Sequence, residues 1–182
     1  FGKVKIHTPG GCHIGVRPMD AHFNAFKDLG FKVAYNEKND IYSISKGNKK
    51  QLKDITLSEF SVTATENLLM YGALHSPLTI KIAAAEPHVQ DLGRFLQALG
   101  ADIEGLGTHE IKIKGKIKAK GGRVRHRVVS DYVEAGTFLV LGAITGSDIT
   151  IADVPVRDLI LPMQKLKEFG LRMEVKGNKV KV

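Results

Sequence analysis

Three glycines, Gly30, Gly100 and Gly170, recur along this chain at a spacing of 70 residues. Each stands between a helix-like amphipathic stretch and a strand-like segment that opens with an apolar residue. Glycine often ends a helix because it adopts the left-handed backbone conformation at no steric cost. The same spacing relates Gly72 to Gly142, each within a strongly apolar stretch. A period this long holds several secondary-structure elements, so the pattern predicts a duplicated α/β module and not the turn of a solenoid.

One module is complete in the sequence. Ser61 is a favourable N-cap for a helix that runs to about His75 and has little polar face, which indicates a helix buried on most sides. A second helix begins at Glu86-Pro87, and its apolar residues share one face while Asp91 lies off it, as in a surface helix. The module is therefore predicted to read strand, helix, strand, helix, strand, strand. Its strands are predicted near residues 54–57, 79–83, 101–104 and 110–114.

The other two modules repeat parts of this pattern. From Asp131 onward the order recurs through the apolar run Phe138–Ile144. The first module has a predicted strand at 4–6, a helix at 18–29 and two further strands, but no buried helix precedes them. Its extra residues lie only between that strand and that helix. Because the chain also lacks an initiator methionine, we expect it to be an internal piece of a longer protein.

Composition limits the class of protein. With 43% hydrophobic and 25% charged residues, the chain has the make-up of a soluble globular protein. Its longest apolar run, Phe138–Ile144, is far shorter than the roughly 20 residues that cross a bilayer, so a soluble and, in a bacterium, cytoplasmic protein is expected. A single cysteine excludes an internal disulfide. The net charge of +8 favours anionic partners such as nucleic acid, phosphorylated metabolites or acidic lipid.

The insertion in the first module contains that cysteine, in the stretch TPGGCHIGVRP. Three glycines around Cys12 disfavour regular helix or strand, so we expect an open, solvent-accessible loop. A lone cysteine is otherwise often a small buried hydrophobe. Arg17 offers a planar guanidinium that matches a carboxylate or a phosphate, although a surface charge ahead of a helix would explain it as well. Loops added to a repeated scaffold commonly carry function.

Several stretches, in order along the chain, resemble the UDP-N-acetylglucosamine enolpyruvyl transferases, or 1-carboxyvinyltransferases. They are the Cys12 loop with Arg17-Pro18-x-Asp20-x-His22, then Ser61-Val62-x-Ala64-Thr65-Glu66-Asn67-Leu68, Glu86-Pro87-x-Val89-x-Asp91, and Glu134-Ala135-Gly136-Thr137-Phe138. The resemblance implies an α/β (α+β) fold, an inside-out α/β barrel built of repeated βαβαββ modules and incomplete here at both ends. It also implies that residues 1–128 belong to a first domain and residues 129–182 open a second.

The resemblance implies an activity and roles for particular residues. The activity is transfer of the enolpyruvyl group of phosphoenolpyruvate to UDP-N-acetylglucosamine, the first committed step of peptidoglycan synthesis, with no cofactor. Cys12 is implied as the catalytic cysteine that fosfomycin alkylates, acting as a general acid or as the nucleophile of a covalent adduct, and Arg17 as a catalytic and substrate-binding residue. The UDP moiety is implied to meet Ser61, Val62 and Thr63, with Asp131 near the active-site hinge.

Plainer roles exist for several of these residues. Ser61 and Asp131 are good N-caps, and Ser61 can combine capping with phosphate binding. Asp20 and His22 fall in the first turn of a helix, where helix capping explains them as well as catalysis does. The sequence also departs from the usual pattern of the family, since Glu59 replaces a common lysine, Thr63 a common glycine and Ala85 a common arginine. These changes affect the expected nucleotide affinity more than the fold.

Two other functions are compatible with parts of the sequence. Lysines alternate with other residues from Ile111 to Lys120, and three arginines follow, as on a cationic strand pair that binds nucleic acid. No aromatic residue is interleaved for base stacking, so the solvated outer face of a sheet is the favoured interpretation. The shikimate-pathway enolpyruvyl transferases share the architecture without this cysteine loop. Dinucleotide, P-loop and metal-ligand spacings are absent from the sequence.

The resemblance also implies that the chain holds only part of an active site. Groups that the second domain would contribute to the active site have no counterpart in these 182 residues. We therefore expect the isolated chain not to turn over. Apolar surface beside Phe138–Ile144 is expected to be exposed, or to be covered by missing modules or by self-association.

Overall fold

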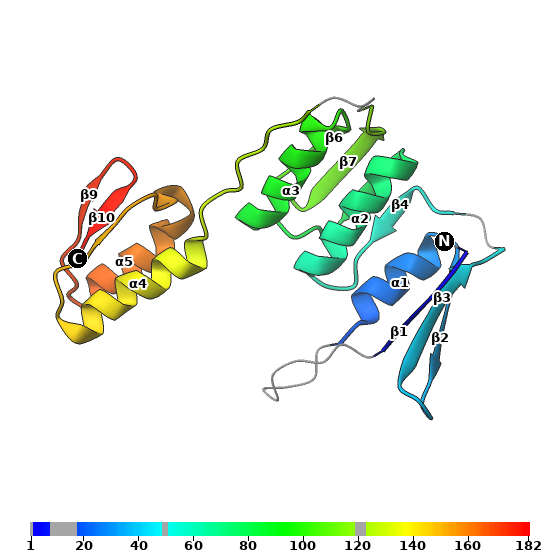
Figure 1. Ribbon diagram of the computed structural model, residues 1–182, viewed down its shortest axis with the longest axis horizontal. Coiled ribbons are helices and arrows are strands. Elements are labelled where there is room, and N and C mark those ends of the chain that lie inside the picture. Colours follow the sequence, from blue (N-terminus) through cyan, green and yellow to red (C-terminus); the bar gives the residue numbers. More distant parts are fainter. Residues whose placement is uncertain (1, 8–17, 49–50, 119–122) are drawn as a thin grey trace. The chain divides into compact units, whose positions relative to one another are not determined.

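The computed structural model describes residues 2–7, 18–48, 51–118 and 123–182, and it divides the chain into two compact units, Phe1–His126 and Arg127–Val182 (Figure 1). Cys12 and Arg17 lie outside the described residues. Each unit combines helices with antiparallel or mixed β-sheet. Within the described part of the chain, no helix combines the length and the apolar character needed to cross a membrane.

The first module of unit 1 is a three-stranded antiparallel sheet with one helix. Its strands pair in the order β1-β3-β2, so the last strand lies between the first and the second. The helix α1 packs against β2 and also against the next module. The elements are β1 (Lys3–His7), α1 (Asp20–Asp28), β2 (Phe31–Asn36) and β3 (Ile41–Lys46).

The second module of unit 1 has the predicted order strand, helix, strand, helix, strand, strand. Its sheet has the strand order β4-β5-β7-β6, in which β4 and β5 are parallel and the remaining pairs antiparallel. The helices α2 and α3 pack against each other. The elements are β4 (Asp54–Thr56), α2 (Val62–His75), β5 (Leu78–Lys81), α3 (Pro87–Ala98), β6 (Asp102–Glu104) and β7 (Glu110–Gly115).

Unit 2 holds one module around a smaller sheet of order β8-β10-β9. Its long helix α4 packs against β8, against a 3₁₀ turn η1 and against the helix α5 that follows this turn. The elements are α4 (Tyr132–Thr145), β8 (Thr150–Ile151), η1 (Val156–Leu159), α5 (Ile160–Glu168), β9 (Glu174–Lys176) and β10 (Lys179–Lys181).

The predicted repeat is confirmed by strand order and by backbone conformation. Strands β1-β3-β2, β5-β7-β6 and β8-β10-β9 follow the same order, with the third strand of each motif in the middle. The glycines that follow α1, α3 and α5 all have positive φ, at 87° for Gly30, 96° for Gly100 and 91° for Gly170. These left-handed residues end the three equivalent helices. The three α/β motifs are therefore structural copies of one another.

A second pair of repeated glycines allows close contact between helix and sheet. A Cβ on Gly72 of α2 would lie 2.3 Å from Cδ1 of Ile113 in β7. A Cβ on Gly142 of α4 would lie 2.4 Å from Cγ2 of Val182, directly after β10. Both distances are far inside van der Waals contact. In each module the absence of a side chain at this position lets the long helix lie against the last strand.

Both long helices expose apolar side chains, and α2 is less enclosed than its sequence predicts. In α2 the face with Leu68, Leu69 and Ala73 is buried in the core of unit 1, whereas Met70 and Leu74 are 45% and 58% exposed. In α4 only Ala135, Leu139 and Gly142 are buried. The remaining large apolar residues of α4 are exposed: Val133, Phe138, Val140, Leu141 and Ile144. The predicted exposure beside Phe138–Ile144 is thus present.

One further side chain differs from its predicted position. Asp91, expected on the solvent face of α3, is 8% exposed, and its Oδ1 lies 3.0 Å from Nε2 of His126. The carboxylate is buried because the chain after β7 returns over this helix, a tertiary contact that helical periodicity does not contain.

Candidate functional site

In unit 1 the helices α1, α2 and α3 begin at the same end of the unit (Figure 1). The connection from β1 to α1 spans residues 8–19, and the equivalent connection from β5 to α3 spans only residues 82–86. The insertion that contains Cys12 and Arg17 therefore joins the carboxyl end of β1 to the amino end of α1. Helix amino termini carry partial positive charge, which favours anionic ligands.

The amino terminus of α2 is held by Ser61 and Thr65. The Ser61 hydroxyl accepts a hydrogen bond from the backbone N–H of Ala64 at 3.3 Å, so the predicted N-cap is confirmed. Thr65, fully buried, donates its hydroxyl to the Ser61 carbonyl at 2.7 Å and accepts the backbone N–H of Ala84 at 3.0 Å. Thr65 thereby connects the first turn of α2 to the segment that leads into α3.

His22 connects α1 to the same turn. Its Nε2 lies 2.9 Å from Thr63 Oγ1, and its Nδ1 lies 2.9 Å from Nδ2 of Asn67 (both on α2). The imidazole is buried, with 8% of the residue exposed. The sequence suggested capping for His22 and Asp20, but Met19 occupies the N-cap position of α1 and no side chain caps this helix. His22 is instead a bridge between two helices.

The environment of His22 favours the neutral imidazole. Burial lowers the pKa of His22, and the nearby charge of Glu59 opposes this effect without cancelling it. An asparagine Nδ2 can only donate, so Nδ1 of His22 accepts from Asn67 and the ring proton resides on Nε2. The Nε2–H then donates to Thr63. Glu59 thus acts electrostatically on His22.

The predicted substrate-binding residues have different positions in this corner. The side chain of Val62 packs against the core of unit 1, so this residue offers its backbone and not its side chain to a ligand. Thr63 is exposed, and Ser61 is partly exposed. We refer to Ser61, Thr63 and His22 as the α2 corner. The α2 corner could hold an anion through the free N–H groups and hydroxyls of the first helical turn.

Asp131 belongs to unit 2, where it caps α4. Its Oδ1 accepts hydrogen bonds from the backbone N–H groups of Val133 and Glu134, at 2.8 and 3.0 Å. The capping interpretation is confirmed, and the carboxylate remains exposed. Asp131 also lines a groove with Ser130, Phe138 and Asp153.

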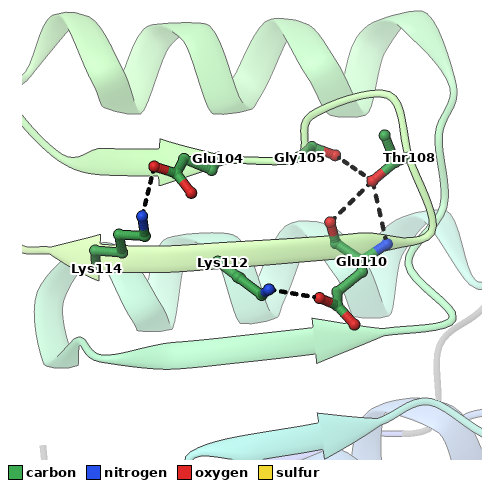
Figure 2. Close-up of polar contacts among 6 residues, drawn as sticks. All are labelled: Glu104, Gly105, Thr108, Glu110, Lys112 and Lys114. Carbon is green, nitrogen blue, oxygen red and sulfur yellow. Dashed lines mark hydrogen bonds and ion pairs between the residues drawn. The ribbon is translucent and has the colours of Figure 1, made fainter.

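The lysines of β7 lie on the solvent face of the sheet and pair with glutamates. Lys112 pairs with Glu110 at 2.8 Å, and Lys114 pairs with Glu104 at 2.5 Å (Figure 2). The hydrogen bond between Lys112 and Glu110 raises the pKa of the lysine and lowers the pKa of the glutamate. All four side chains are about half exposed. This mixed-charge surface agrees with the solvated outer face that the sequence favours over a uniform cationic strip for nucleic acid.

A comparison with models of protein families shows to which family the chain belongs. The model for EPSP synthase (3-phosphoshikimate 1-carboxyvinyltransferase) matches residues 1–182. The chain belongs to the EPSP synthase family. Among curated members of this family, the chain is 39% identical over 177 residues to UDP-N-acetylglucosamine 1-carboxyvinyltransferase of Acidobacterium capsulatum, covering 97% of the chain and 39% of that protein. It is 42% identical over 187 residues to UDP-N-acetylglucosamine 1-carboxyvinyltransferase 2 of Prochlorococcus marinus, covering 100% of the chain and 43% of that protein. The resemblance inferred from the motifs is confirmed.

Solved structures of EPSP synthase family members share the fold. The enolpyruvyl transferase NikO from Streptomyces tendae matches all of the chain with a TM-score of 0.74 and 20% identity, over 43% of its own length. EPSP synthase from Acinetobacter baumannii matches 98% of the chain with a TM-score of 0.59 and 21% identity, over 41% of its length. The chain therefore spans about two fifths of the length of the relatives that it matches.

Proposed function

We propose that this chain is part of a cytoplasmic UDP-N-acetylglucosamine 1-carboxyvinyltransferase, which transfers the enolpyruvyl group of phosphoenolpyruvate to the UDP-sugar in peptidoglycan synthesis and needs no cofactor. The observation that carries the proposal is the set of curated relatives with this name, 34–42% identical over nearly the whole chain. The anion-favouring helix termini of unit 1 support it, because both substrates are phosphorylated.

Cys12 and Arg17 carry the chemistry in this proposal. The reaction requires a proton donor for the methylene carbon of phosphoenolpyruvate and a cation that holds its carboxylate or phosphate. Cys12 meets the first requirement as a general acid, or forms a covalent adduct as a nucleophile, and it is the residue that fosfomycin would alkylate. Arg17 meets the second requirement with a guanidinium fork. Ser61, Val62 and Thr63 hold the UDP moiety, and Asp131 is a further substrate-binding residue.

In this proposal unit 1 is part of a first domain, residues 1–128, and unit 2 opens a second domain, residues 129–182. Each domain is an inside-out α/β barrel when all of its modules are present. The isolated chain then holds only part of an active site, and positioning of both substrates, worth about 7 to 11 kcal/mol in well-oriented reactions, is largely lost. We therefore expect the chain alone to bind a substrate without turnover.

The test is phosphate release from phosphoenolpyruvate in the presence of UDP-N-acetylglucosamine. The chain is assayed alone and with Cys12→Ala as its matched control, and shikimate 3-phosphate replaces the UDP-sugar in a parallel reaction. Binding of the UDP-sugar without turnover agrees with the proposal. Phosphate release only with shikimate 3-phosphate would assign the chain to the other carboxyvinyltransferase. Cysteine-dependent multiple turnover with the UDP-sugar would support the substrate and disprove the partial site.

A further inference from the structure

We propose that His22 is a positioning residue that orients the hydroxyl of Thr63 as a hydrogen-bond donor to the diphosphate of a UDP-sugar bound at the α2 corner. This inference rests on the proposed function, because it concerns how the same corner recognises its ligand.

The direction of the hydrogen bonds follows from the chemistry of Asn67. The amide nitrogen of Asn67 has protons and no lone pair to offer, so it donates to Nδ1 of His22 across 2.9 Å. A neutral imidazole with an accepting Nδ1 carries its proton on Nε2. That proton is donated across 2.9 Å to Oγ1 of Thr63. The chain of hydrogen bonds therefore runs in one direction, from Asn67 through His22 to Thr63.

The last member of this chain has a proton left to donate. A threonine hydroxyl is one donor as well as an acceptor, and His22 satisfies an acceptor position of Thr63. Among the described residues, no further hydrogen bond of this hydroxyl is found. Thr63 is the second residue of α2 and is exposed, whereas His22 behind it is buried. Its hydroxyl is therefore accessible to a ligand at the helix amino terminus.

The class of ligand follows from the hydrogen-bond donors that surround the Thr63 hydroxyl. The backbone N–H groups of the first turn of α2 and an oriented O–H together offer only donors. A phosphate oxygen accepts several hydrogen bonds at once, and such charge-assisted bonds are stronger than those between neutral groups. A uracil or ribose group would not require such a set of hydrogen-bond donors. The diphosphate is therefore the part of the UDP-sugar that Thr63 is inferred to contact.

The orientation is tested by nitrogen NMR of the imidazole in the full chain without ligand. His22 is expected to be neutral at pH 7.5, with the proton on Nε2 and a hydrogen-bonded Nδ1. A proton on Nδ1, or a charged ring, would overturn the proposal whatever the chain binds. This measurement needs no substitution, so it does not depend on the folding of a variant.

The role in recognition is tested by binding of UDP-N-acetylglucosamine, UDP and uridine to three variants. Thr63→Val retains the shape without the hydroxyl and is expected to bind both diphosphates about tenfold more weakly or worse, with uridine unchanged. Thr63→Ser restores the donor and should restore most of the affinity. Thr145→Val is the matched control, because the Thr145 hydroxyl bonds within unit 2, to the Leu141 carbonyl and to Ser147.

The action of His22 through Thr63 is tested by combining substitutions. His22→Phe is expected to weaken UDP binding in the unaltered chain and to have little further effect in Thr63→Val. Equal effects in both backgrounds, or a loss of uridine binding equal to the loss of UDP binding, would overturn the proposal. If the unaltered chain binds neither UDP nor the UDP-sugar, the proposed function of this corner is wrong and the donor role falls with it, while the NMR result still decides the orientation of His22.

Discussion

Replacement of Gly72 by alanine should destabilise unit 1, although alanine is the better helix former. The new Cβ would lie 2.3 Å from Cδ1 of Ile113 and 3.1 Å from Cδ2 of Leu78. Ile113 is 1% exposed in the middle of the sheet, so it has no free space into which to move. Overpacking of this kind costs about 1–3 kcal/mol. Alanine in a helix recovers about 1 kcal/mol, so the expected net loss is at most about 2 kcal/mol.

The structure provides a direct test of this reason. Ile113→Val removes the clashing Cδ1 and alone should cost about 1 kcal/mol. In the double variant the alanine is accommodated. The stability loss of the double variant should therefore be smaller than the sum of the two single losses by about 1 kcal/mol or more. Gly136→Ala is the matched control, because its Cβ would contact only Leu159, at 3.4 Å, and should stabilise α4. Urea unfolding followed by circular dichroism, with hydrogen exchange resolved for each unit, measures these changes. A Gly72→Ala variant as stable as the parent, or losses that add fully, would refute the close-packing argument.

Three further predictions concern the site residues. Burial lowers the pKa of His22 in the folded chain. The contribution of His22 to the stability of unit 1 is therefore complete above the pKa of the unfolded chain, near 6.5, and is lost as the pH falls from there through the folded pKa. The urea midpoint should fall with pH in this way in the parent and not in His22→Gln. Asp131→Ala should cost unit 2 about 1 kcal/mol in the same unfolding assay, and Asp131→Asn much less, because asparagine retains the cap; equal losses would point away from capping. Cys12 should react quickly with a thiol reagent in the native chain, and protection until denaturant is added would contradict an open loop.

The fold was largely predictable because the local conformational preferences of single residues mark the ends of its repeated helices. Gly30, Gly100 and Gly170 mark helix ends through a conformation that few other residues adopt. Ser61 and Asp131 mark helix starts through side chains that accept the first free N–H groups. These signals depend on a few neighbouring residues, so the sequence contains them in full. The strand order inside each sheet is not contained in these local signals.

The polar contacts of the candidate site were not predictable in the same way. His22 and Thr63 are 41 positions apart, and Asp91 and His126 are 35 apart. Helical periodicity placed Asp91 in solvent, and only the return of the chain over α3 buries it. A signal for His22 existed in the sequence, since it shares a motif with Arg17 and lies near the start of a helix. Its partner on α2, however, is determined by the packing of two modules.

The apolar surface of α4 also bears on how the chain is made in the cell. In unit 1, α2 is flanked by α1, which is synthesised earlier, so this flank is ready when α2 leaves the ribosome. Among the described residues of unit 2, α4 packs against α5, η1 and β8, all synthesised after it. Within unit 2, α4 therefore emerges before these elements, and its residues Val133, Phe138, Val140, Leu141 and Ile144 are exposed. Such surfaces promote aggregation of newly made chains. Unit 2 is therefore the part of the nascent polypeptide that a chaperone would be expected to hold.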